Sequence, residues 1–312
     1  MSFPSLVTLD IGGTKINAGR YVNGVIEDSR SFKFCANASL SEIECFIINC
    51  IDGFLIQSTT AICIGVPCIV DTQLGVVYDA VNIPAWKEFD LKSALQRRYH
   101  LDVYINNDVN CFTAGEHRFG AGQGYDDIIG LCLGTGVGAG YIINNELYQG
   151  HNCSAGEIGE VCYLTSTIDE YCSGRFFDLH IGASGTDLAV KARSGEAYAI
   201  EAYSQFGRHL AHAISHLLLI LDPQVIVIGG SVAHSFDLFK EELWLGLADF
   251  PYNKVIENLK IIPSSNRDTA LLGAAQLYLN QCKQNKKTEV TAQIVNSREV
   301  SAESYLTSPQ PS

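Results

Sequence analysis

Two glycine-rich segments and one acidic segment contain the residue types that phosphate chemistry requires. The first is DIGGTK (10–15), in which Asp10 ends a β-rich run and two glycines let backbone amides approach an anion closely. Asp10 could hold Mg²⁺ directly or through water, and Thr14 adds a hydroxyl donor. A hairpin turn would explain the same residues equally well. The GxxxxGK(S/T) pattern of a Walker loop is absent.

The second glycine-rich segment is LGTGVGAG (133–140), which alternates four glycines with other residues. Apolar runs that favour β-strands precede and follow it, whereas the glycines of a dinucleotide-binding fingerprint open a helix. A turn between two strands would present amides to phosphate oxygens. A flexible or bulged hairpin is the alternative interpretation. The presence of two such segments favours a shared phosphate site.

The acidic segment is INND (105–108), which ends a predicted buried strand. Ligands of α/β lobes lie at the carboxyl ends of strands, so Asp108 could accept a proton from a hydroxyl that attacks a phosphoryl group. Alternatively, Asp108 is the N-cap of a helix that begins at Val109, a role that Asp performs well. These residues by themselves leave both interpretations open.

Three further segments are candidates for ligand contacts. GEIGE (156–160) spaces Glu157 and Glu160 so that both could accept hydrogen bonds from vicinal sugar hydroxyls, although a solvated acidic turn has the same pattern. The small residues of IGGS (228–231) and LGAA (272–275) would admit a purine ring or another backbone at close range. Helix packing explains the last two segments equally well.

Hydrophobic periodicity and turn residues predict the elements that position these segments. The pattern is that of an α/β chain in which each glycine-rich segment connects two strands. Asn23-Gly24 marks a hairpin. The predicted strands cover residues 5–10, 15–22, 25–34, 61–66, 102–108, 127–134, 225–230 and 260–263, and residues 141–148 are predicted to be a strand that enters a turn. The predicted helices cover 40–57, 90–99, 109–118, 197–220 and 270–280.

The chain is long enough for two lobes, because its 312 residues exceed the ~250–300 at which a single core stops growing. The glycine-rich FGAGQG (119–124) is the predicted boundary. We expect a small lobe at 1–119, joined by part of a helix at 270–282, a large lobe at 120–269 and a flexible polar tail at 283–312. LDIGGTK and CLGTGVG repeat one pattern, which predicts a duplicated fold with one turn from each lobe facing a shared cleft.

The composition argues against several classes of function. The formal charge is −13, with 47% hydrophobic and 18% charged residues, so the chain is a poor match for nucleic acid or an anionic membrane face. A secretory signature and a membrane-spanning apolar run are both absent, and the eleven cysteines lack a CxxC pair, so we expect a cytoplasmic protein with reduced thiols. His209, His212 and His216 recur on one predicted helix, where a polar or packed face explains them better than a metal site lacking a third ligand.

Taken together, these segments resemble the motifs of the ROK family, named for repressors, open reading frames and kinases. The resemblance covers most of residues 5–282. LDIGGTK is similar to the first phosphate motif of the family, INND to its catalytic loop, LGTGVGAG to its second phosphate motif, AGEIG to the start of its ExGH sugar motif and VIGGS to its turn on the adenosine side. GVPCIVD and AVNIPAW resemble the segments that close over the sugar.

The resemblance implies an ATP-dependent hexose or N-acylhexosamine kinase with the two-lobed actin-like (ribonuclease H-like) ATPase fold. Asp108 would be the base at the sugar 6-hydroxyl, and Mg²⁺ would bridge the phosphates of ATP. The implied sugar contacts are Asn82, Asn107, Glu157, Glu160 and Asp169. The implied contacts to ATP and Mg²⁺ are Asp10, Gly12, Gly13, Thr14, Lys15, Gly134, Thr135, Gly136, Val137, Gly229, Gly230 and Ser231.

Two departures from the family pattern affect the sugar motif. Glu160 stands where ExGH ends in His, and the CxCGxxGC cluster that normally follows is missing, which places Asp169 where a sugar-binding Glu normally stands. Cys162 and Cys172 remain, but two isolated thiols cannot make a four-ligand site, so we expect no structural zinc.

Glucose is the expected substrate, with an N-acetylhexosamine (N-acetylglucosamine or N-acetylmannosamine) as the alternative within the family. A non-catalytic sugar-binding regulator is the alternative from another class. The first phosphate motif begins at Asp10, which leaves no room before it for the DNA-binding segment that such regulators carry. The family habit implies a homodimer.

Overall fold

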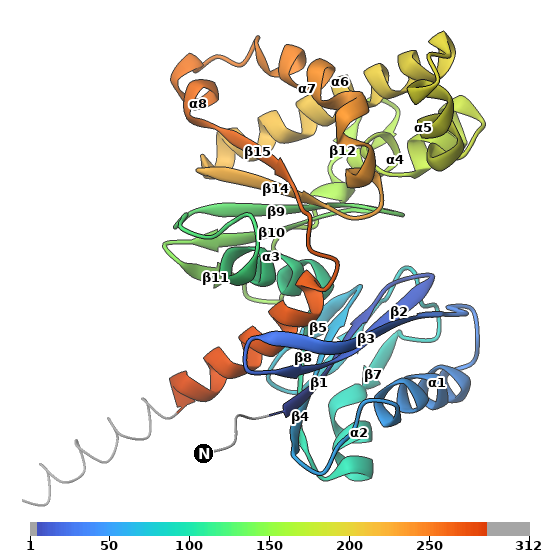
Figure 1. Ribbon diagram of the computed structural model, residues 1–312, viewed down its shortest axis with the longest axis vertical. Helices are drawn as coiled ribbons and strands as arrows, with labels where there is room; N and C mark the ends of the chain where they lie inside the picture. The colour runs from blue at the N-terminus through green and yellow to red at the C-terminus, as the bar shows by residue number, and fades with distance from the viewer. Residues whose placement is uncertain (1–4, 286–312) are drawn as a thin grey trace, which may run out of the picture.

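The computed structural model describes residues 5–285, which form two lobes stacked along the long axis of the molecule (Figure 1). Each lobe is built on a five-stranded sheet that contains both parallel and antiparallel pairs. The two-lobed α/β fold expected from the sequence is confirmed.

The two sheets share one topology. Their strand orders are β3-β2-β1-β4-β8 in the small lobe and β11-β10-β9-β14-β15 in the large lobe. In each sheet a central strand, β1 or β9, pairs antiparallel with the next strand and parallel with a later one. The small-lobe strands are β1 (Ser5–Ile11), β2 (Lys15–Val22), β3 (Val25–Lys33), β4 (Thr59–Val66) and β8 (Asp102–Asn107), and those of the large lobe are β9 (Ile128–Leu133), β10 (Val137–Ile143), β11 (Glu146–Tyr148), β14 (Val225–Gly229) and β15 (Lys260–Pro263). A glycine-rich turn therefore occupies the same place in each lobe.

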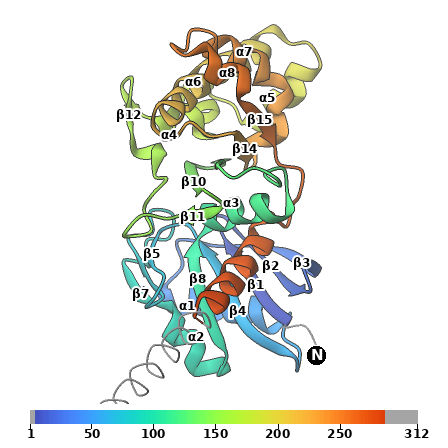
Figure 2. The same cartoon turned by 90° about the vertical axis from the view of Figure 1, so that its left-hand side faces the viewer.

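Helices cover both faces of each sheet. In the small lobe, α1 (Leu40–Asp52) and α2 (Leu91–Tyr99) pack on one face, and the helical residues 269–285 pack on the other (Figure 2). In the large lobe, the outer face is covered by α4 (Ile168–Cys172), α5 (Gly185–Arg193), α6 (Ala197–Leu221) and α7 (Phe236–Leu247), with α8 (Asn253–Asn258) beside them. The inner face of this sheet packs on α3 (Asp108–Phe119).

Helix α3 lies between the two sheets and contacts both (Figure 1). Glycines of β9 and β10 face it: a Cβ at Gly140 would lie 2.3 Å from Thr113 Oγ1, and one at Gly138 would lie 2.8 Å from Val109 Cγ2. The prediction that all of LGTGVGAG forms a turn is therefore wrong, because β10 already begins at Val137. Only residues 134–136 turn, and the later glycines admit the helix.

Two hairpin turns depend on positive φ angles. The predicted turn at Asn23 and Gly24 is confirmed, with φ of 48° and 89°. The strand expected to enter a turn within 141–148 is also confirmed: β10 ends at Ile143, and Asn144 and Asn145, with φ of 52° and 66°, form the turn before β11. Asn tolerates this left-handed conformation better than most residues do.

Two predicted ends also differ from the structure. The helix expected at 40–57 stops at Asp52, where Gly53 forms its C-cap. The helix expected at 270–280 continues to residue 285 and so includes the first three residues of the expected tail; the rest of that tail (286–312) lies outside the described residues. The other predicted helices and strands lie within a few residues of the observed ones.

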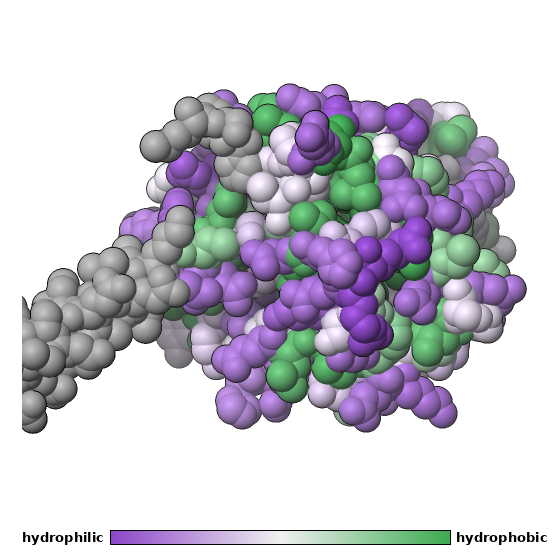
Figure 3. Space-filling view, turned by 90° about the horizontal axis from the view of Figure 1, so that it is seen from below, coloured by the Kyte–Doolittle hydropathy of each residue, from purple (hydrophilic) through white to green (hydrophobic). Residues whose placement is uncertain are grey.

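Several short elements project from the two lobes. Strands β5 (Ile69–Asp71), β6 (Val76–Tyr78) and β7 (Glu88–Asp90) form a small sheet, and β12 (Cys162–Tyr163) and β13 (Ser166–Thr167) form a hairpin. Short helical turns are η1 (Ile158–Glu160), η2 (Phe177–Ile181) and η3 (Val232–Ser235). Hydrophilic residues predominate on the small-lobe end, where hydrophobic ones are scattered (Figure 3). Between residues 5 and 285, none of the helices has the length and apolar character needed to cross a membrane.

Candidate active site

Three parallel strands of the small lobe bring their polar ends to one edge of the sheet. Asp10 of β1 pairs with Gly65 of β4, which in turn pairs with Asn106 of β8. Asp108 follows two residues later, and a Cβ at Gly65 would lie 3.2 Å from its Cα. Asp10 and Asp108 therefore approach each other across a glycine, at the carboxyl ends of strands where ligands of α/β folds bind.

The N-cap of α3 is Asn107, not Asp108. The Asn107 side-chain oxygen accepts hydrogen bonds from the backbone N–H groups of Val109, at 2.9 Å, and Asn110, at 3.1 Å. The capping alternative for Asp108 is thus wrong, because the preceding residue does this work and α3 begins at Asp108 itself. Asp108 accepts one hydrogen bond, from Val109 N–H to its Oδ1 at 2.9 Å. Its carboxylate is left available for chemistry.

The carboxylates in this region repel one another. Burial raises the pKa of Asp108 well above its ordinary range, and the charges of Asp10 and Glu157 raise it further. Burial also raises the pKa of Asp10, against the lowering effect of a 2.9 Å hydrogen bond from Asn17 and of the nearby charge of Lys15. A general base needs a raised proton affinity, and clustered carboxylates attract a divalent cation.

The first glycine-rich turn connects β1 to β2 beside Asp10. Gly12 N–H donates to the carbonyl of Lys15 at 2.9 Å, which closes the turn. Asn82 lies against this turn, since a Cβ at Gly13 would be 3.0 Å from the Asn82 Cβ. Thr14 and Lys15 are exposed at its tip. The structure thus places one predicted sugar contact beside the predicted phosphate contacts.

The second glycine-rich turn lies close to the two aspartates of the small lobe. Cys132 is two residues before this turn, and after burial it is Asp108 and Asp10 that raise the pKa of its thiol most. Val109, which follows Asp108, contacts Gly138, just beyond the turn. The two turns therefore approach the same acidic pair, one from each lobe.

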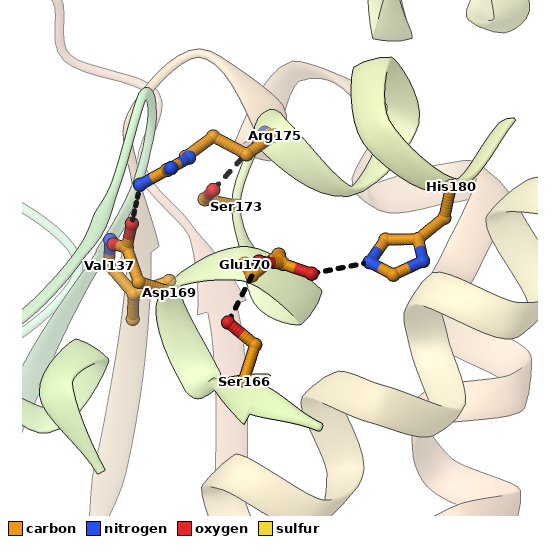
Figure 4. Close-up of polar contacts among 7 residues, drawn as sticks. All are labelled: Val137, Ser166, Asp169, Glu170, Ser173, Arg175 and His180. Atoms are coloured by element: carbon orange, nitrogen blue, oxygen red, sulfur yellow. Dashed lines mark hydrogen bonds and ion pairs between the residues drawn. The ribbon is translucent and has the colours of Figure 1, made fainter. Parts of the chain in front are cut away.

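Asp169 holds the second turn in place. Its Oδ1 accepts a hydrogen bond from Val137 N–H at 2.6 Å, and its Oδ2 is paired with Arg175 Nη1 at 3.1 Å (Figure 4). The Val137 amide, predicted to contact phosphate, is therefore engaged by a carboxylate. No hydrogen bond among the described residues engages the amides of Thr135 or Gly136, which remain free to donate. The predicted role of Asp169 as a sugar contact stays a prediction.

The third glycine-rich turn follows β14, the neighbour of β9. Gly230 has a φ of +83°, and a Cβ there would lie 2.2 Å from the carbonyl oxygen of Leu133. Gly229 contacts the ring of Phe112 on α3. Ser231 is exposed next to this turn. The predicted adenosine-side residues thus lie directly beside the start of the second turn.

The GEIGE loop is fastened to β10. Gly156 has a φ of +112°, and its hypothetical Cβ would lie 1.7 Å from the carbonyl oxygen of Ala139, so only glycine fits there. The carbonyl of Gly156 accepts a 2.8 Å hydrogen bond from Ala139 N–H. Glu157 is exposed as a whole residue, but partial burial of its carboxylate raises the pKa, and the charges of Glu160 and Asp169 raise it further. Glu160 is exposed at the end of η1.

An aromatic and histidine cluster fills the region where the family pattern places its cysteines. The ring of Tyr163 stacks on His212 with centroids 4.4 Å apart, and its hydroxyl is 3.0 Å from His209 Nδ1. Tyr171 stacks on His180, which is 3.0 Å from Glu170 (Figure 4). Over residues 5–285, no group of three or more potential ligands is arranged to hold a metal ion.

A buried amide network supports residues 105–108 from inside the protein. Asn106 donates to the hydroxyl of Tyr104 at 2.8 Å and to Gln149 Oε1 at 3.2 Å, and its own oxygen accepts from Asn110 at 3.1 Å. Cys153 contacts both asparagines at 3.5 Å. Because Gln149 and Cys153 come from the large lobe, this network links the loop at 105–108 to both lobes.

Comparison with known proteins decides the family. The chain matches the model of the ROK family over residues 6–281. It belongs to the ROK family. It is 28% identical over 270 residues to a glucokinase of Streptomyces coelicolor, which covers 74% of this chain and 83% of that enzyme. It is 29% identical over 265 residues to an N-acetyl-D-glucosamine kinase of Vibrio cholerae, which covers 75% and 86%.

A solved ROK structure has the same fold. The ROK family glucokinase of Streptomyces griseus, in complex with glucose and AMPPNP, superposes with a TM-score of 0.74 at 26% identity, covering 88% of this chain and 98% of that one. The predicted actin-like architecture of the family is therefore confirmed.

The residues of this ROK chain fit a nucleotide and a magnesium ion. The free amides of Thr135 and Gly136 suit phosphate oxygens, and Gly134 has open space in place of a side chain. The carboxylate of Asp10, close to that of Asp108, is the kind of hard oxygen ligand that Mg²⁺ prefers, directly or through water.

Sequence reasoning missed three residues of this ROK site. Arg175 pairs with Asp169, Asn17 binds Asp10, and Gln149 reaches Asn106 across the lobes. Each is a single polar residue outside any glycine-rich or acidic motif. Only Asn17 could have been found, because a hairpin of β1 and β2 with a three-residue turn at 12–14 places it opposite Asp10.

Proposed function

We propose that this chain is an ATP-dependent hexokinase that transfers the γ-phosphoryl group of ATP to the 6-hydroxyl of an aldohexose, with glucose favoured. The proposal depends on the position of the Asp108 carboxylate. Asn107 caps α3 in its place, and the carboxylate lies beside glycine-rich turns from both lobes. Similarity to the Streptomyces glucokinases supports glucose.

Asp108 is the proposed general base. Its raised pKa favours acceptance of the proton from the sugar hydroxyl as that oxygen attacks phosphorus. The first residue of α3 is also at the positive end of the helix dipole, which favours the ionised form of the carboxylate. The two influences on the pKa of Asp108 act in opposite directions: burial and the neighbouring carboxylates raise it, and the helix dipole lowers it.

The remaining residues position the reactants. Thr14, Thr135 and Gly136 donate to phosphate oxygens, and the turn at Gly229, Gly230 and Ser231 borders the nucleoside. Magnesium ion, when bound near Asp10, neutralises charge on the transferred group. Such catalysis depends on alignment and charge stabilisation more than on covalent chemistry.

Sugar recognition is assigned to residues around Asp108. Asn82 beside the first turn, the side-chain NH₂ of Asn107, and Glu157 and Glu160 on the GEIGE loop are the proposed hydroxyl partners. The Asn107 oxygen is committed to the helix cap, so this residue can act toward a sugar only as a donor. An N-acetylhexosamine is the second candidate, supported by the Vibrio relative.

A coupled assay of ADP release tests the proposal. Purified protein with ATP and Mg²⁺ is given glucose, N-acetylglucosamine, N-acetylmannosamine, mannose, fructose and allose in turn. We expect the highest kcat/KM with glucose. A higher kcat/KM with an N-acetylhexosamine would show that this sugar, and not glucose, is the preferred substrate of the same reaction. Sugar binding by calorimetry without ADP release from any member of the panel would favour the non-catalytic regulator and contradict the kinase.

A further inference from the structure

A cavity of about 320 Å³ lies at the opposite end of α3 from Asp108. Its walls come from the last turns of α3, the β10–β11 hairpin and the helix at 269–285, which Figure 2 shows side by side. None of the residues assigned to sugar or ATP lines it. Its size lies in the range of ~300–1,000 Å³ that small-molecule sites occupy.

Three basic side chains line this cavity in a strongly acidic protein. They are His117 and Arg118 of α3 and Lys283 of the C-terminal helix. Acidic residues outnumber basic ones by 34 to 21 in the chain, yet within residues 5–285 no ion pair joins Arg118 or Lys283 to a carboxylate. The helix dipole favours cations at the end of α3 but does not explain why Lys283 converges from another helix.

Amide side chains supply the remaining polar atoms of the cavity. Gln276 donates to Asn280 Oδ1 at 2.7 Å, which leaves the Asn280 NH₂ group as a donor. His117 Nε2 is 3.2 Å from Asn145 Oδ1, which joins α3 to the β10–β11 turn. None of the residues that line the cavity is acidic, and the side-chain amide of Asn145 donates to Asp126, which lies outside the lining. The unpaired charges in the lining are therefore positive.

We propose that this cavity binds a small anion that carries a phosphate group, held by Arg118 and Lys283 through charge-assisted hydrogen bonds. The cavity spans elements of both lobes where α3 and the C-terminal helix cross in backbone contact: a Cβ at Gly115 would lie 2.0 Å from the carbonyl oxygen of Thr269. An anion there ties the helix that begins with Asp108 to both lobes, so the site is placed to regulate catalysis. The binding claim does not depend on the proposed activity.

The test is a calorimetric titration of the full chain at fixed ionic strength with two probes, sodium phosphate and glucose 6-phosphate. The variants are Arg118→Gln and Lys283→Gln. Arg97→Gln is the matched control, because Arg97 is also an exposed arginine in the last turn of a helix but lies on α2, outside the cavity. Thermal unfolding in chloride buffer checks that each variant folds.

We expect at least one probe to bind and each cavity variant to weaken its affinity by about tenfold or more, while Arg97→Gln leaves it unchanged. An equal loss of affinity for both probes in the cavity variants would identify phosphate as the whole determinant. Glucose 6-phosphate is also the product of the proposed reaction, so only the part of its affinity that the cavity variants remove supports the site. Absence of binding, or equal affinity in the wild type and both cavity variants, would overturn the proposal, since the phosphate would then bind elsewhere.

Discussion

Replacement of Asp108 by Asn separates the chemical role of this side chain from its structural one. Asn has the same size but cannot accept the proton of the attacking hydroxyl. General bases contribute about 10²–10⁴-fold to rate, so we expect kcat to fall by that factor. The fold should survive, because Asn107 and not Asp108 caps α3.

The effect on stability follows from two opposing contributions. Loss of the negative charge at the start of α3 removes a favourable dipole interaction of about 0.3–1 kcal/mol. The same change also removes the cost of burying a negative charge beside Asp10, which is what raises the pKa of Asp108. We therefore expect the free energy of unfolding to stay within about 1 kcal/mol of the wild type, or to rise.

The assay pairs ADP release with urea unfolding, and Asp187→Asn is the matched control. Asp187 is an exposed residue in the first turn of α5, so its replacement loses the dipole interaction alone. It should leave kcat unchanged. The reasoning is refuted if Asp108→Asn keeps kcat within about threefold of the wild type, far short of the loss expected for a general base. A large loss of stability would instead indicate that Asp108 caps α3.

Three further predictions concern the supports of the site. Asp169→Ala removes the acceptor of the Val137 amide, so it should loosen this turn and raise the KM for ATP about tenfold, with the sugar KM unchanged; a rise in the sugar KM instead would assign Asp169 to the sugar. Gly140→Ala should lower the free energy of unfolding in urea by about 1–3 kcal/mol, because its Cβ would meet Thr113. The control Gly53→Ala should lower it little, since the nearest neighbour of a Cβ there is 3.6 Å away. Equal losses in the two variants would contradict the role of Gly140 in packing. Burial and neighbouring charges lower the pKa of His209 below its ordinary 6.5, so the free energy of unfolding should be highest above pH 6.5 and fall as the pH drops below it. A His209→Gln variant should show a smaller dependence of the free energy of unfolding on pH. An unchanged dependence would remove His209 from the explanation.

The general architecture could be predicted from the sequence because its signals are local. Buried strands such as 61–66 are continuous apolar runs, and the hairpin at Asn23-Gly24 has a known turn chemistry. The repeat of strand and glycine-rich turn correctly indicated two lobes of one topology. Periodicity and turn residues suffice wherever neighbours in sequence decide the conformation.

Glycine and asparagine were misread where distant contacts decide their role. The glycines at 138 and 140 exist to admit α3, a helix that precedes them by some twenty residues, and nothing nearby distinguishes them from turn glycines. Asn107 and Asp108 are both good capping residues, and only the coordinates show which one bonds to the helix. The charge pairs of Asp169 and the cavity at the end of α3 depend on tertiary contacts between separate motifs.

The central claim, that a sugar 6-hydroxyl beside Asp108 attacks the γ-phosphoryl group of ATP, is tested most directly by phosphorus NMR of the product. Glucose and 6-deoxyglucose are incubated in parallel with ATP, Mg²⁺ and the wild-type chain. The account predicts one new phosphomonoester signal coupled to the protons on C6 with glucose, and no new signal with 6-deoxyglucose, which should still compete with glucose. A phosphorylated product from 6-deoxyglucose, or attachment of phosphate to another carbon of glucose, would contradict it.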